Sequence, residues 1–133
     1  MTALTKDVAT SYRTGTETID PVTANVKIYA GALVVLDAAG NARNGITGTN
    51  LIARGVAQHV ADNTGGSAGA ITVKSRRGVF LFNNDGSINR THIGKLVYIV
   101  DDQTLAASNG GNTRSEAGKC IDVESGRVWV EIK

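Results

Sequence analysis

The apolar residues of this chain are grouped in short bursts of four to six residues, and this grouping limits the fold more than any other feature. Gly, Asn, Asp and Ser separate the bursts, and most bursts are rich in the β-branched and aromatic residues that suit strands. None is long enough to show the 3.6-residue period of an amphipathic helix. The pattern predicts an all-β domain, a compact barrel or sandwich, of about eight short strands. The eight bursts are residues 26–29, 33–36, 52–57, 70–75, 79–82, 96–100, 119–123 and 128–132.

The composition is that of one folded domain. Of the 133 residues, 41% are hydrophobic and 20% are charged, which is enough apolar material for a core. The net charge of +2 gives little attraction to nucleic acid or anionic membranes. No apolar stretch approaches the roughly 18 residues that a membrane-spanning helix needs, and the first residues lack the pattern of a signal peptide. We therefore expect a product of the cytoplasm with neither a membrane nor a nucleic acid as partner.

The first residues differ in character from the rest of the chain. Six of the first 20 are Thr, and large apolar groups are few, so neither a helical nor a strand period is sustained. The only proline, Pro21, forces the preceding Asp20 toward extended geometry. The sequence predicts an extended N-terminal arm over residues 1–22 and a β-domain over residues 23–133.

The last residues predict a β-hairpin. The sequence from residue 122 to 130 carries Ser125-Gly126 between two apolar runs. Alternation along the second run places Val128 and its alternate neighbours on the core face and Trp129 on the other face. Two interpretations of Trp129 are open: it is a partly exposed anchor, or another segment covers it, for which the arm is the obvious candidate.

The residues that could perform chemistry are few and scattered. His59 and His92 are too few for a histidine metal cluster, and neither has a cysteine or paired carboxylates nearby. Cys120 is the only cysteine, so no intramolecular disulfide forms, and its flanks match no cysteine-enzyme motif; we expect it to be buried and inert. Asp101 and Asp102 are neighbours at a strand end and point to opposite faces. The sequence predicts no metal site, no cofactor and no enzymatic activity.

A succession of apolar strands, several of them led by Gly, runs through residues 20–133. The stretches that carry it are residues 27–37, 53–57, 93–104, 117–123 and 128–132. Their order and spacing resemble the small capsid decoration proteins of tailed bacteriophages, also called cement or head-stabilising proteins. The resemblance implies a β-barrel or β-tulip-like body.

The resemblance also implies a function and a partner. Proteins of this family are structural virion proteins that bind the major capsid protein on the outer surface of the capsid, commonly as homotrimers, and stabilise its lattice. It implies that the N-terminal arm grips the capsid protein or a neighbouring subunit, as an extended segment can do by adding a strand to a sheet edge. The arm residues Tyr12, Arg13 and Ile19, together with Trp129, are then the candidate contacts.

Other interpretations are open. The arm could be a disordered terminus without a function. The protein could be another virion subunit, from the tail or the baseplate, with the same all-β composition. It could also be a small OB-like module that binds single-stranded nucleic acid, although the low net charge and only six aromatic residues argue against this.

Overall fold

The computed structural model describes residues 2–11, 13 and 15–133, and this part of the chain contains twelve β-strands, one short 3-10 turn and no α-helix. The all-β prediction is confirmed, and each of the eight predicted bursts contains a strand. Strands β1, β4, β6 and β10 lie outside those bursts. In chain order the elements are β1 (Glu17–Pro21), β2 (Lys27–Ile28), β3 (Leu33–Leu36), β4 (Ala42–Asn44), β5 (Ile52–Ala57), β6 (Ala61–Asp62), β7 (Thr72–Arg76), β8 (Gly78–Asn84), η1 (Arg90–His92), β9 (Leu96–Ile99), β10 (Thr104–Ala106), β11 (Glu116–Glu124) and β12 (Arg127–Ile132).

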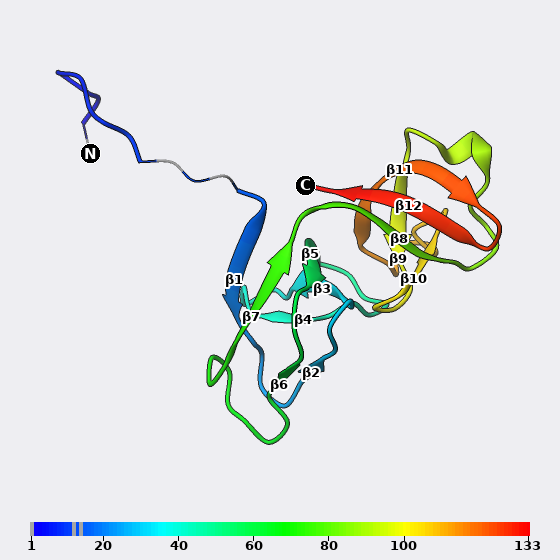
Figure 1. The fold of residues 1–133 in the computed structure, drawn as a ribbon, viewed down its shortest axis with the longest axis horizontal. Helices are drawn as coiled ribbons and strands as arrows, with labels where there is room; N and C mark the ends of the chain where they lie inside the picture. Colours follow the sequence, from blue (N-terminus) through cyan, green and yellow to red (C-terminus); the bar gives the residue numbers. More distant parts are fainter. Residues whose placement is uncertain (1, 12, 14) are drawn as a thin grey trace.

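The strands form two halves, a five-stranded sheet and a small closed barrel (Figure 1). The sheet has the order β1-β7-β5-β3-β4, and the barrel has the order β10-β8-β12-β11-β9. Strands β2 and β6 make a separate antiparallel pair beside the sheet. β7 leads through Arg77 directly into β8, so two successive strands belong to different halves. Gly78 begins β8 with a φ of +152°, a conformation that glycine adopts readily.

The protein has two hydrophobic cores, and strand β3 lies between them and contributes side chains to both. Leu33 and Val35 belong to the core of the barrel, whereas Val34 belongs to the core under the sheet. All three are completely buried, because side chains on a strand alternate between its faces and both faces of β3 are covered. The unbroken apolar run Leu33–Leu36 is therefore the sequence signature of a strand buried on both sides.

The predicted terminal hairpin is present in the barrel. β11 and β12 pair antiparallel, with Cys120 opposite Val130, and Gly126 has a φ of +71° in the connecting turn. Val128, Val130 and Ile132 are buried, as the alternation predicts. β10 pairs in parallel with β8 and antiparallel with β9, and this closes the barrel.

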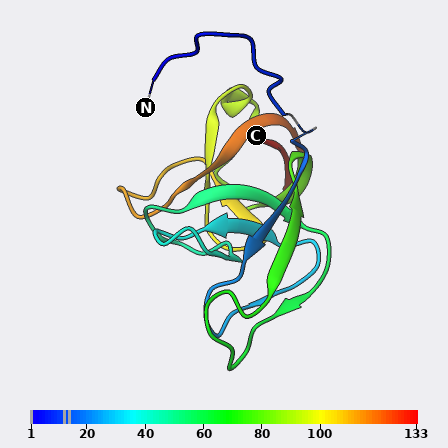
Figure 2. The ribbon, with the colours of Figure 1, turned by 90° about the vertical axis from the view of Figure 1, so that its left-hand side faces the viewer.

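The stretch that the sequence assigns to the arm contains β1. This strand pairs with β7 from Glu17 to Pro21, and the two lie side by side in Figure 2. Val22, the next residue, is completely buried in the core under the sheet. On the inner face of β1 the Thr18 hydroxyl lies 3.0 Å from the hydroxyl of Ser75. Residues 17–22 are thus part of the folded body, and the sequence hides this because the inward side chains of β1 are polar.

An ion pair attaches β1 to the sheet. Asp20 points inward and accepts two hydrogen bonds from the Arg54 guanidinium, at 2.8 Å from Nε and 3.1 Å from Nη2. The carboxylate is nearly buried and the guanidinium is mostly so. A bidentate pair in a partly buried setting is strong because both hydrogen bonds are charge-assisted.

We expect Asp20→Asn to lower the free energy of unfolding by about 2 kcal/mol, because a neutral amide leaves the Arg54 charge unpaired in a partly buried place. Urea unfolding measures the change. The control is Glu17→Gln on the outer face of the same strand, where the ion pair is exposed and its loss leaves the midpoint almost unchanged. Equal losses in the two variants would contradict the prediction.

Candidate binding surface

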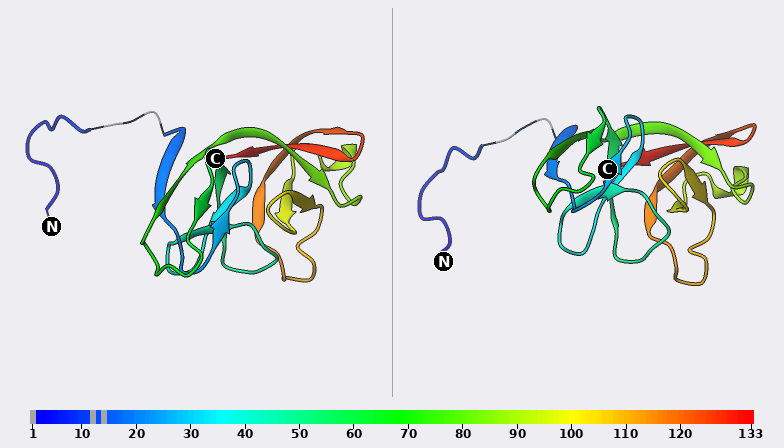
Figure 3. Two further views of the ribbon diagram at one scale, coloured as in Figure 1. Left: turned by 60° about the horizontal axis from the view of Figure 1, so that its bottom comes forward. Right: turned by 90° about the horizontal axis from the view of Figure 1, so that it is seen from below.

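The N-terminal segment, here residues 2–11 and 13, extends away from the body (Figure 3). Every residue of the segment is exposed, including Leu4 at 76% and Val8 at 56%. Arg13, one of the predicted contacts, is exposed in it. Tyr12, another predicted contact, lies outside the described residues. The segment therefore presents exposed apolar side chains and a backbone that belongs to no strand, with a bend at Thr5 and Lys6.

The segment leads into an edge strand of the sheet. Within the described residues, β7 is the one strand that pairs along β1. Ile19, the third predicted arm contact, is 67% exposed on the outer face of β1, opposite Lys74. Glu17 lies beside it, with its carboxylate 2.9 Å from Lys74 Nζ and 3.5 Å from Arg76 Nη2. The hydrogen bond and charge of Lys74, followed by the charge of Arg76, lower the pKa of Glu17. The exposed Ile19 is therefore flanked by a negatively charged Glu17 and by positively charged Lys74 and Arg76.

Trp129 does not belong to this surface. It lies half-buried on β12, and its indole Nε1 donates a hydrogen bond of 2.9 Å to Glu124 Oε1 in the same hairpin. The turn of that hairpin and the N-terminal segment lie at opposite ends of the molecule (Figures 1 and 3). Of the two interpretations of Trp129, the structure shows a partly exposed side chain held by its own hairpin. The structure thus brings Arg13 and Ile19 to one end of the molecule and leaves Trp129 apart from them.

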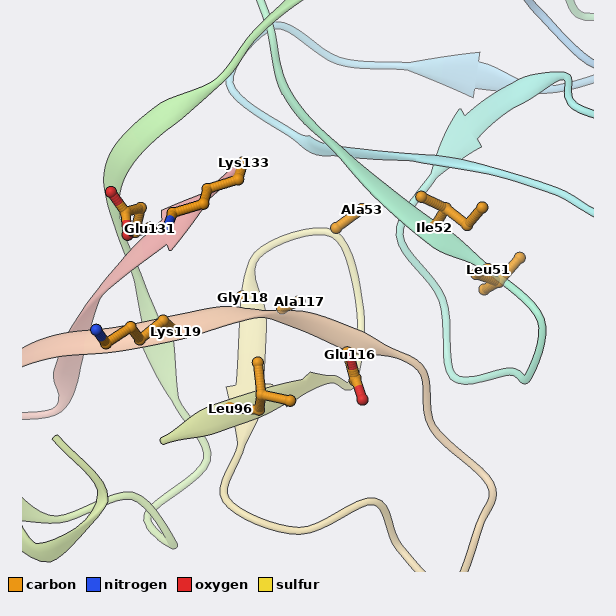
Figure 4. Close-up of a pocket in the computed structure, with 10 residues that line it drawn as sticks. All are labelled: Leu51, Ile52, Ala53, Leu96, Glu116, Ala117, Gly118, Lys119, Glu131 and Lys133. Carbon is orange, nitrogen blue, oxygen red and sulfur yellow. Dashed lines mark ion pairs between the residues drawn. The ribbon is translucent and has the colours of Figure 1, made fainter. Parts of the chain in front are cut away.

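A groove lies where the sheet meets the barrel (Figure 4). Leu51 and Ile52 line one side and Leu96 of β9 lines the other, around a volume of about 470 Å³. Charged side chains stand at its margin, among them Glu131 and Lys133, whose charged groups are 3.8 Å apart. Both apolar and charged side chains therefore line the groove.

Sequence reasoning missed this groove. Ile52 lies in one predicted strand and Leu96 in another, whereas Leu51 directly precedes the first of them. What joins them is the approach of β5 to β11, a contact between strands far apart in the chain. No local pattern in the sequence marks the groove, because which side chains line it depends on how these distant strands pack.

The two histidines were the candidates for a metal site that the sequence offered. The described residues contain no group of three or more His, Cys, Asp and Glu that could hold a metal ion. His59 is bonded to backbone at both ring nitrogens: Nδ1 lies 2.9 Å from Val60 O, and Nε2 accepts from Lys74 N at 3.1 Å. His92 Nδ1 accepts from the N–H of Asn89 in the turn η1. Both histidines serve local backbone structure.

Cys120 and the two adjacent acids lie where the sequence places them. Cys120 is completely buried, as predicted, and burial, with a smaller effect from Asp122, raises the pKa of its thiol. Asp101 is exposed and accepts a hydrogen bond from Gln103 N in the turn after β9. Asp102 is half-buried, and burial followed by the charge of Asp101 raises the pKa of its carboxyl. The two neighbouring carboxyl groups therefore have different surroundings.

The chain was compared with protein-family models, curated proteins and solved structures, and none of them matches it. Among the described residues no helix has the length and apolar character to cross a membrane.

Proposed function

We propose that this protein is a structural virion protein that binds the outer surface of a tailed-phage capsid and stabilises its lattice. One observation carries the proposal: an exposed N-terminal segment with apolar side chains leads directly into an edge strand of a folded β-body. The resemblance of residues 20–133 to capsid decoration proteins supports the same conclusion. The partner in this proposal is the major capsid protein, and the protein acts as a homotrimer on the lattice.

The proposed mechanism is binding without catalysis. The extended segment adds its backbone to a sheet edge of the partner, so that main-chain hydrogen bonds give affinity while Leu4 and Val8 fill small apolar pockets. Each contact is weak by itself. Repetition over a closed lattice and over three linked copies raises the effective affinity by orders of magnitude. The body then ties neighbouring capsid subunits together.

Deletion of residues 2–15 is the experiment that tests this function. Because β1 begins at Glu17, the truncated protein is expected to fold and to keep its unfolding midpoint. We expect its occupancy on heads assembled from the matching capsid protein, measured by co-sedimentation, to fall at least about tenfold. Full occupancy of a folded truncation would overturn the role of the segment.

A pair of point variants refines this experiment. Leu4→Ser combined with Val8→Ser removes the apolar side chains and keeps the backbone, whereas Val60→Ser removes from the body an apolar side chain that is about as exposed as Val8. We expect weaker binding for the first variant and unchanged binding for the second. If neither full-length nor truncated protein binds heads but single-stranded oligonucleotide is shifted in a salt-sensitive way, the nucleic-acid interpretation replaces this one.

A further inference from the structure

Two Asn-Gly pairs occur in this chain, and the structure places them in opposite surroundings. Asn44-Gly45 ends strand β4, and Asn109-Gly110 lies in the loop between β10 and β11. Asn-Gly is the dipeptide in which a backbone nitrogen attacks the preceding side-chain amide most readily, because glycine offers no side chain to block the approach and leaves the backbone free to turn. The two pairs therefore allow a comparison within one molecule.

The Asn44-Gly45 pair is held in place by the pairing of the sheet. Asn44 is paired with Val34 of the buried strand β3, and Gly45 N donates a 2.8 Å hydrogen bond to Leu33 O. Gly45 itself is buried, with the carbonyl oxygen of Asp101 close to where a Cβ would stand. The Gly45 nitrogen can attack only after this part of the sheet opens, and local opening of a paired strand costs free energy.

In the loop, Asn109 is held by hydrogen bonds to its side chain and its carbonyl, whereas the attacking Gly110 nitrogen is accessible. Gly110 is exposed, and among the described residues its N–H has one hydrogen bond, a long one of 3.4 Å to Ser108 Oγ. Gly110 and Gly111 both have positive φ, at +64° and +72°. No strand pairing holds the Gly110 nitrogen in place.

The loop also holds the reacting carbonyl in a polarised state. Asn109 Oδ1 accepts hydrogen bonds from the backbone N–H groups of Gly111 and Asn112, each at 3.2 Å. These donors point at the oxygen that gains negative charge when the side-chain carbon Cγ is attacked. Two backbone N–H groups aimed at a developing oxyanion lower the barrier to its formation.

We propose that Asn109 is a site of spontaneous deamidation, a modification separate from the proposed capsid function. The Gly110 nitrogen gives its proton to solvent base and forms a bond to Asn109 Cγ. The bond from Cγ to Nδ2 breaks and ammonia leaves, which yields a cyclic succinimide. Water then adds to one of the two ring carbonyls, and the ring opens to aspartate or isoaspartate. The net change is gain of water and loss of ammonia, with no oxidant or reductant.

The product changes the surface beside this loop. Asn109, Arg114 and Glu116 are among the residues that line one hollow of about 300 Å³. Deamidation places a carboxylate in its wall and lowers the formal net charge of the protein by one. It also removes the Nδ2 donor that bonds to Asn112 Oδ1 at 3.0 Å, and isoaspartate adds a methylene to the backbone of the turn. The loop loses part of its hydrogen bonding while the barrel strands keep theirs.

Peptide mapping of the intact folded protein tests the proposal. The protein is incubated at mildly alkaline pH, digested at acidic pH, and the conversion of amide to acid is followed at both asparagines by mass spectrometry. We expect Asn109 to convert at least about tenfold faster than Asn44, because β4 must open before Gly45 can attack. In denaturant the two rates are expected to approach each other.

Two variants make the outcome decisive. Asn109→Gln keeps an amide but lengthens the side chain, and it should abolish the appearance of the fast acidic species on ion exchange. Asn44→Gln should leave that species unchanged. Equal rates at the two sites in the folded protein would overturn the proposal, as would an Asn109 that stays intact in the folded protein while it converts in the unfolded chain.

Discussion

Replacing Leu33 by Ala is expected to lower the free energy of unfolding by about 3 to 4 kcal/mol, the range for a fully buried leucine whose cavity cannot collapse. Leu33 is completely buried and packs into the barrel core from β3, the wall between the two cores. Paired strands on both sides of β3 prevent the backbone from moving to fill the space. Urea unfolding followed by Trp129 fluorescence measures the loss as a lower midpoint at unchanged slope.

The matched control is Leu96→Ala on the outer face of β9. Leu96 is 45% exposed at the groove, so its truncation leaves no enclosed cavity and is expected to change the stability by less than about 1 kcal/mol. A similar loss of stability in the two variants would contradict the prediction, because it would mean that Leu33 on β3 is no more tightly packed than Leu96 at the surface.

Much of the body could be predicted because its strands carry their own signals. Leu33–Leu36 is apolar throughout and is buried on both faces, whereas Arg127–Ile132 alternates and has one buried face. Ser125-Gly126 marks the turn between β11 and β12 with a residue suited to positive φ. These features are local, so they can be read without knowing the partner strands.

The strands outside the predicted bursts depend on contacts that sequence does not show. β1 turns Thr18 and Asp20 inward, and these polar groups are satisfied by Ser75 and Arg54 from distant strands. Asn63, just after β6, is likewise almost completely buried, and its Nδ2 donates hydrogen bonds to Thr23 O and Ser67 O. Polar residues become core residues only where the fold supplies their partners.

The exposure of part of the candidate surface could be predicted. The exposed N-terminal segment follows from its lack of apolar period, and Ile19 is exposed at its base. The placement of Trp129 away from that segment, and the groove between β5 and β9, follow from how the two halves pack. That packing depends on pairings between strands distant in the chain, which single-sequence patterns do not specify.

Replacing Gly118 by Ala is expected to destabilise the protein by at least about 3 kcal/mol, at the upper end of the range for overpacking. Gly118 lies in β11 next to an irregularity in its pairing with β9. A Cβ there would overlap the carbonyl oxygen of Glu131 on β12 and would lie 3.0 Å from Val130 Cγ1. β11 is held between β9 and β12 in a closed barrel, so it cannot move away from one neighbour without losing pairing to the other.

Gly48→Ala is the matched control for this variant. Neither glycine has a φ in the left-handed region, so alanine is acceptable to the backbone at both positions and only the surroundings differ. At Gly48 the nearest atom to the new methyl is Leu51 Cδ1 at 3.4 Å, the end of a side chain that can shift. We expect that variant to stay within about 1 kcal/mol of the parent in urea unfolding, because ordinary van der Waals contact replaces open space. Equal tolerance of alanine at both positions would contradict the prediction. It would mean that β11 and β12 can separate enough to accommodate a methyl group at position 118.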